Sequence, residues 1–326
     1  MATSFDQTPF VLSPPAAPVE RHGRVDLYLP TADGPSPAVV LVHGVPLPPG
    51  APDPRDWLLY RGYGDLLAEQ GLVAAVVSHR VHDMASLPLG AADVADAVAL
   101  VRAGPRVDPE RLVLWFFSGG GLLLADYLRE RPSWLRGIAA TYPLLGPMPG
   151  WGEVDERFLP LPALDAAGDL PIVLTRAGRD APPILAATDA FTAAAAERGR
   201  PVRLLHVPDG RHGFDALDHT DQSRDAVRAA RDAVVSLTPD RPRVTIDSMA
   251  PTWRLPARPD PAMSATCSAH RAPAAASLGL FPGWLTPCRP HGGIHARRTP
   301  PCRRHAAAVW AACPVRPRLS AGVTPE

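Results

Sequence analysis

Short apolar runs of strand length recur along the chain, separated by longer amphipathic stretches. A continuous apolar run is typical of a strand that is buried on both faces of a parallel sheet. The run at residues 37–42, which ends in His43 and Gly44, has this character most clearly. The pattern as a whole predicts strands over residues 24–29, 37–42, 72–77, 112–117, 137–141, 171–176 and 202–207.

Between these runs, apolar residues three and four positions apart predict helices. Val94, Ala97, Val98 and Val101 share one face of the segment 89–103. The same reasoning predicts helices over residues 57–70, 89–103, 119–131, 183–198 and 221–237. Strands that alternate with helices predict an α/β fold with a mostly parallel sheet covered on both faces. The ligand site of such a sheet lies off the carboxyl ends of its strands.

Changes in composition divide the chain into segments. Residues 1–19 are polar and proline-rich and are expected to form a flexible arm, and residues 20–238 carry the alternating pattern. Within that domain, residues 143–170 have no clear period, and we expect a short cap excursion there. Residues 239–326 are rich in Pro, Arg and Ala and are expected to be disordered.

The net charge of zero hides two unlike pieces. Residues 1–240 hold 21 Arg and 30 acidic residues, a net charge of −9, whereas residues 241–326 hold 12 Arg and 3 acidic residues, a net charge of +9. An acidic main domain argues against nucleic acid as its partner, because phosphate binding needs concentrated positive charge. A basic tail that contacts RNA or an acidic partner stays open as an alternative to disorder.

Targeting signals are also absent from the pattern. The sequence has no run of 18 uncharged apolar residues, so we expect no membrane partner. The first 20 residues show no basic region followed by an apolar stretch, so a secretory signal is not expected and a cytoplasmic location is.

Cysteines occur only near the C-terminus. The first 240 residues contain none, so the main domain offers no thiol nucleophile. The spacing of the four fits no compact zinc knuckle, and a zinc site with nearby histidines is the less favoured alternative. The four are Cys267, Cys288, Cys302 and Cys313.

The segment 112–123, LVLWFFSGGGLL, is the most informative for chemistry. A buried strand runs into Ser118, then three glycines, then an apolar helix. A serine on such a tight turn projects its hydroxyl above the sheet edge, next to the positive end of the helix. An ordinary glycine-rich turn with a capping serine is the alternative. The chain has no G-x-x-x-x-G-K-[ST] and no lysine, which excludes a Walker-type phosphate loop.

A serine nucleophile needs a base and an acid, and both follow predicted strands. His212 lies in the loop after the strand 202–207, and Asp180 follows the strand 171–176. The base activates the hydroxyl, and the acid orients the imidazole and stabilises its cation. Asp215 or Asp218 could orient His212 instead.

The oxyanion needs backbone amides close to the serine. The N–H groups of Gly119 and Val45 are the candidates, since Pro46 has none. We expect His43 to shape the loop rather than act as a base. Other candidates for the substrate pocket are Gly44, His79 and Trp151. A metal pair of His79 and His82 is an alternative to a role for both as loop residues.

Four short segments together resemble one family. They are VLVHG at 40–44, FSGG at 117–120, AGRD at 177–180 and GRHGF at 210–214. Over roughly residues 20–238 the sequence resembles an α/β-hydrolase of the dienelactone-hydrolase-like group. The resemblance implies a sheet of about eight strands, Ser118 as nucleophile, His212 as base and Asp180 as acid. A cysteine can be the nucleophile in this group, but here the serine must carry that role.

One departure from the family pattern concerns the nucleophile turn. The usual sequence is G-x-S-x-G, and Phe116 stands at the first glycine position. The ring needs space, which a small residue such as Gly121 or Ala125 would provide.

These observations predict a serine hydrolase that acts on a small carboxylic ester or lactone, with no metal and no organic cofactor. Two alternatives stay open: a catalytically silent binding module with this fold, and an acyltransferase or peptidase that uses the same three residues.

Overall fold

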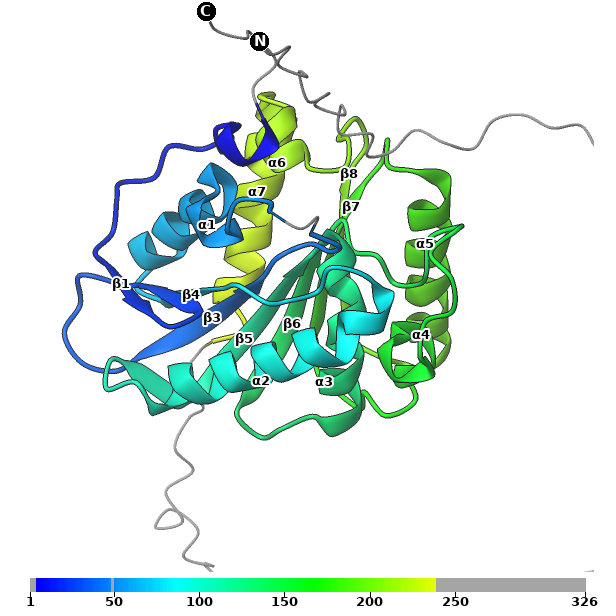
Figure 1. Cartoon of the computed structure of the whole chain (residues 1–326), viewed down its shortest axis with the longest axis horizontal. Helices are drawn as coiled ribbons and strands as arrows, with labels where there is room; N and C mark the ends of the chain where they lie inside the picture. The colour runs from blue at the N-terminus through cyan, green and yellow to red at the C-terminus, as the bar shows by residue number, and fades with distance from the viewer. Residues whose placement is uncertain (1–3, 48–49, 239–326) are drawn as a thin grey trace, which may run out of the picture. The chain divides into compact units, whose positions relative to one another are not determined.

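The computed structural model describes residues 4–47 and 50–238. Its centre is an eight-stranded sheet in the order β1-β2-β4-β3-β5-β6-β7-β8 (Figure 1). β1 pairs antiparallel with β2 and β2 with β4, and every other neighbouring pair is parallel. This confirms the predicted mostly parallel sheet. The strands are β1 Val19–His22, β2 Val25–Tyr28, β3 Ser36–Val42, β4 Val73–Val77, β5 Val107–Phe117, β6 Leu135–Thr141, β7 Ile172–Ala177 and β8 Val202–Val207.

Helices cover both faces of the sheet, and the side chains of each strand are shared between two apolar clusters. Val40 and Val42 of β3 pack into the cluster that contains α2 and α3, whereas Val39 and Leu41 pack into the one that contains α1 and α7 (Figure 1). This alternation explains why the central strands have continuous apolar sequences. The helices are α1 Leu58–Glu69, α2 Leu87–Ala103, α3 Leu124–Glu130, α4 Pro160–Ala163, α5 Pro182–Glu197, α6 Phe214–Leu217 and α7 Asp221–Val235.

The sequence pattern missed the elements that lack an apolar signal. All four residues of β1 are exposed at the edge of the sheet, so its sequence, VERH, shows no alternation. The helix predicted over residues 119–131 begins as a 3-10 helix, η4 Ser118–Leu123, and becomes α-helical only at Leu124. Three consecutive glycines with low helix propensity account for this difference.

The N-terminal segment packs on the domain, which corrects the expectation of a flexible arm. Phe10 and Val11 are buried, and the Phe10 ring lies 4.7 Å from the Tyr63 ring of α1. The Val11 N–H donates to the carbonyl oxygen of Asp215, 2.9 Å away. Burial of these side chains therefore holds the segment against α1, despite its proline-rich composition. The expectations for residues 239–326, the four cysteines among them, lie outside the described residues.

The segment between β6 and β7 does not form a cap over its whole length. Phe158 and Leu164 are fully buried in the cluster on the α2 and α3 face. Arg157 pairs with Asp126 of α3 at 2.8 Å, and α4 contacts both α3 and α5. Residues 156–170 are thus part of the helical layer and form the connection from β6 to β7, which corrects the expectation of a cap over 143–170.

Residues 84–103, which include α2, are long and apolar enough to span a membrane by length and composition alone. In the structure Leu87, Val94 and Val101 of this segment are fully buried against the sheet. The segment therefore serves as a core helix of the α/β domain.

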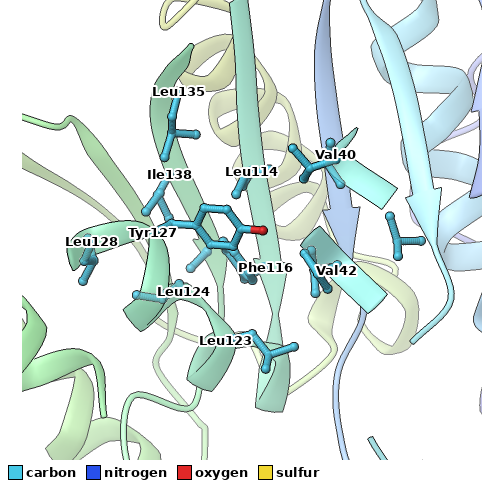
Figure 2. Packing of buried hydrophobic residues seen from close by; sticks show 14 of the residues in the cluster. Val40, Val42, Leu114, Phe116, Leu123, Leu124, Tyr127, Leu128, Leu135 and Ile138 are labelled. Atoms are coloured by element: carbon cyan, nitrogen blue, oxygen red, sulfur yellow. The ribbon is translucent and has the colours of Figure 1, made fainter. Parts of the chain in front are cut away.

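Phe116 fits into the core without disturbing the turn that follows it. Its side chain is fully buried, and its ring lies 6.1 Å from that of Tyr127 (Figure 2). Val42 and Ala140 flank it on the neighbouring strands, and Ala125 belongs to the same apolar cluster. The ring is thus accommodated in the core, with the small Ala140 beside it on β6.

Candidate active site

Ser118 occupies a sharp turn between β5 and η4. Its backbone has a φ of 50°, in the left-handed region that side chains other than glycine rarely adopt. The turn is held in place because the N–H of Leu144 donates to the Ser118 carbonyl oxygen at 2.8 Å. Backbone strain of this kind persists only where the surroundings enforce it, and it is concentrated at functional sites.

The structure brings Ser118, His212 and Asp180 into one chain of hydrogen bonds. The Ser118 Oγ lies 2.7 Å from His212 Nε2, and His212 Nδ1 lies 2.8 Å from Asp180 Oδ2. The three residues follow β5, β8 and β7, whose carboxyl ends meet at one edge of the parallel sheet. With Nδ1–H donating to the carboxylate, Nε2 is left to accept the serine proton.

Burial decreases from Asp180 through His212 to Ser118. The Asp180 side chain is 2% exposed and that of His212 is 15% exposed, while Ser118 is half-buried. Asp180 Oδ1 accepts the N–H of Ala181 at 2.7 Å, so both carboxylate oxygens have partners. The carboxylate is therefore fixed inside the protein, whereas the serine keeps part of its surface exposed.

The loop after β3 lies directly against the turn that carries Ser118. A Cβ added to Gly44 would lie 2.9 Å from Ser118 Cβ, and one added to Gly119 would lie 2.2 Å from the Val45 carbonyl oxygen. Among residues 4–47 and 50–238, the N–H of Val45 donates no hydrogen bond. Gly119 lies in the first turn of η4, where backbone N–H groups have no partner within the helix. The turn and the loop thus bring the N–H groups of Val45 and Gly119 close to the serine.

His43 and His79 form a stacked pair beneath this loop, with ring centroids 3.6 Å apart. His43 Nε2 accepts the N–H of His79 at 3.2 Å, and His43 Nδ1 lies 2.8 Å from the Gly44 carbonyl oxygen. Burial lowers the pKa of His43 to about 4, which keeps it neutral. Both side chains are buried and brace the loop, and their expected role in a substrate pocket stays a prediction.

Among the described residues, Trp151 and His82 form no hydrogen bond with Ser118, His212 or Asp180. Trp151 is half-buried and packs against the apolar cluster on the α2 and α3 face. The exposed His82 contacts the Leu47 carbonyl oxygen through Nδ1 at 3.1 Å. Within the described part of the chain, no three His, Cys, Asp or Glu side chains form a group that could hold a metal ion.

Asp215 and Asp218 do not bind His212 directly. Asp218 pairs with Arg211. The Asp215 carboxylate accepts hydrogen bonds from the hydroxyls of Tyr63 and Tyr142, each at 2.8 Å. Sequence reasoning missed both tyrosines, although Tyr142 directly follows the predicted strand 137–141 and could have been sought at the same sheet edge.

We expect Gly120→Ala to destabilise the domain by roughly 1–3 kcal/mol, because the new methyl group overpacks the turn. A Cβ at this position would lie 2.4 Å from the His43 carbonyl oxygen, a backbone atom that cannot rotate away. Urea unfolding followed by circular dichroism measures the change. Gly146→Ala is the matched control, since its nearest neighbour would lie 4.0 Å away. Equal stability of the two variants would contradict the close contact.

Comparison with known proteins extends only to the fold. No protein-family model and no curated protein matches the chain. Among solved structures, the native esterase Est2 of the planctomycete Thermogutta terrifontis is similar, with a TM-score of 0.55 and 20% identity over 71% of this chain and 95% of that chain. A bacterial heroin esterase is similar with a TM-score of 0.59 and 18% identity over 70% of this chain and 87% of that chain. With its strand order, this likeness shows that the chain has the α/β-hydrolase fold.

Proposed function

We propose that this protein is a serine hydrolase that cleaves a small carboxylic ester or lactone. The observation that carries the proposal is the unbroken hydrogen-bond chain from Asp180 through His212 to Ser118. A serine hydroxyl is a weak nucleophile unless a base is aligned with it, and here the imidazole is in hydrogen-bonding range.

The mechanism follows from the roles that these groups can take. Ser118 Oγ attacks the carbonyl carbon while His212 Nε2 accepts its proton, and Asp180 stabilises the resulting imidazolium. The N–H groups of Val45 and Gly119 donate to the oxyanion of the tetrahedral intermediate. His212 then protonates the leaving alcohol, and a water molecule activated by the same imidazole releases the acid from Ser118.

The structural neighbours support an ester as the substrate class. Est2 has also been solved with propionate bound, and this structure is similar to the chain with a TM-score of 0.55 at 19% identity. A short acyl group is consistent with the absence of a full cap over residues 143–170. The assignment to the dienelactone-hydrolase-like subgroup rests on the sequence motifs alone. Activity measured on a panel of short p-nitrophenyl esters and small lactones tests this assignment.

A fluorophosphonate probe tests the proposed chemistry directly, since only an activated serine reacts with it. We expect stoichiometric labelling of the folded protein, mapped to Ser118 by peptide mass spectrometry, and no labelling after unfolding in urea. A folded protein that resists the probe would contradict the proposal and favour a silent binding module. The accommodation of Phe116 removes the main structural reason for that alternative.

A further inference from the structure

Behind His212 lies a buried carboxylate that the proposed mechanism does not use. Asp215 is fully buried in α6, three residues after the histidine. It accepts three hydrogen-bond contacts from two tyrosine hydroxyls: Tyr63 at 2.8 Å, and Tyr142 at 2.8 and 2.9 Å to its two oxygens. It forms no ion pair among the described residues. A buried carboxylate without a cation costs stability, so core packing alone does not explain an aspartate here.

Tyr142 connects this carboxylate to the imidazole. It follows β6 with a left-handed backbone, φ 38°, and its N–H donates to the Thr175 carbonyl oxygen at 2.7 Å. Its ring lies 4.7 Å from the His212 ring, with an angle of 53° between the planes. The backbone is thus held in a rare conformation that places the ring next to the histidine, while the hydroxyl reaches Asp215.

From this arrangement we propose that Tyr142 and Asp215 are positioning residues for His212. The Tyr142 ring restricts the imidazole from the side, while Asp180 and Ser118 hold its two nitrogens. The Asp215 carboxylate fixes Tyr142 and supplies a second negative charge that favours the imidazolium formed in the transition state. The inference rests on the proposed hydrolase function and deepens it.

The titratable groups that face His212 and Asp215 come from three parts of the chain. Asp180 faces His212 from the loop after β7, and Tyr142 faces it from the end of β6. Tyr63, and at longer range Tyr60, approach Asp215 from α1. Burial raises the pKa of Asp215 to about 6 and raises the pKa of both hydrogen-bonded tyrosines, so at pH 8 the carboxylate is ionised and the phenols are neutral.

Asp215→Asn tests the proposal, because it keeps the shape and removes the charge. At pH 8 we expect kcat to fall about tenfold, the equivalent of one pKa unit, with KM nearly unchanged. The pKa of His212, measured by NMR with His212→Gln for assignment, should fall, because a nearby negative charge is removed. The acidic limb of kcat/KM then moves to lower pH. Asp65→Asn, on α1, is the matched control and should leave these quantities unchanged.

Thermal unfolding shows whether Asp215 positions His212 or only stabilises the fold. The pKa of Asp215 is higher in the folded than in the unfolded protein, so its ionisation lowers stability as the pH rises through about 6. Asp215→Asn should therefore have an equal or higher Tm than the wild type at pH 8. If Asp215→Asn lowered both kcat and Tm, the loss of activity would be explained by lost stability and the proposal would be overturned. An unchanged kcat together with an unchanged His212 pKa would also overturn it.

Tyr142→Phe keeps the proposal testable if the asparagine variant does not fold. It retains the ring next to His212 but removes two of the three contacts to Asp215. We expect a fall in kcat, because the ring is no longer anchored to Asp215, whereas Tyr127→Phe, at another buried tyrosine, should leave kcat unchanged. An unchanged kcat for Tyr142→Phe would contradict the inference. Fluorophosphonate labelling of the wild type tests the hydrolase function separately, and the NMR titration does not require turnover.

Discussion

Ser118→Ala is expected to lower kcat for a short p-nitrophenyl ester by roughly a millionfold. The variant lacks the oxygen that lies 2.7 Å from His212 Nε2, so no covalent acyl intermediate can form. Catalysis above the rate in water would then come only from the backbone amides and from binding. Stopped-assay kinetics at pH 8 with purified variant measures the loss, and circular dichroism verifies that the fold is kept.

Ser78→Ala is the matched control for that experiment. Ser78 also directly follows a parallel strand, β4, but has no contact with His212 among the interactions of the described residues. We expect the control to retain full turnover. Activity that survives in Ser118→Ala, or that is lost equally in both variants, would rule out Ser118 as the nucleophile.

Asp180→Asn is expected to lower kcat by about ten-thousandfold. Asp180 Oδ2 accepts the Nδ1–H of His212 at 2.8 Å, whereas an amide nitrogen in its place would donate to Nδ1. The ring proton would then move to Nε2, which could no longer accept the serine proton. The carboxylate is almost completely buried, so bulk solvent cannot replace it.

Two comparisons make this prediction specific. Asp209→Asn changes an exposed carboxylate in the loop before His212 and should leave kcat unchanged. Asp215→Asn should have a far smaller effect than Asp180→Asn, because Asp215 acts on His212 through Tyr142 and at longer range. If the two effects were equal or reversed, Asp180 would not be the residue that orients the imidazole.

The strands and long helices were predictable because their signals are local. β4 Val73–Val77 and α1 Leu58–Glu69 coincide with the predictions within a residue or two, since burial on both faces leaves continuous apolar runs and burial on one face leaves a helical period. The edge strand β1 was missed because all its side chains are exposed, so its sequence carries no apolar pattern. The N-terminal segment was misjudged, because two buried residues among many prolines give no periodic signal.

The candidate site was predictable to the extent that it follows topology. Ser118, Asp180 and His212 each come after a parallel strand, and the carboxyl ends of such strands share one sheet edge. The stacking of His43 on His79 was not predictable, because a position in a loop does not tell whether a side chain points outward or is stacked beneath the backbone.

By itself, the sequence determined the α/β architecture and the order of serine, acid and histidine along the chain. The hydrophobic period and the ends of the strands can both be recognised from short stretches of sequence. Only the tertiary structure decided that Asp180, and not Asp215, hydrogen-bonds His212. It also decided that Phe116 fits beside the nucleophile turn and that Tyr142 lies next to the imidazole. These outcomes depend on distances between residues far apart in the chain, and no local pattern encodes them.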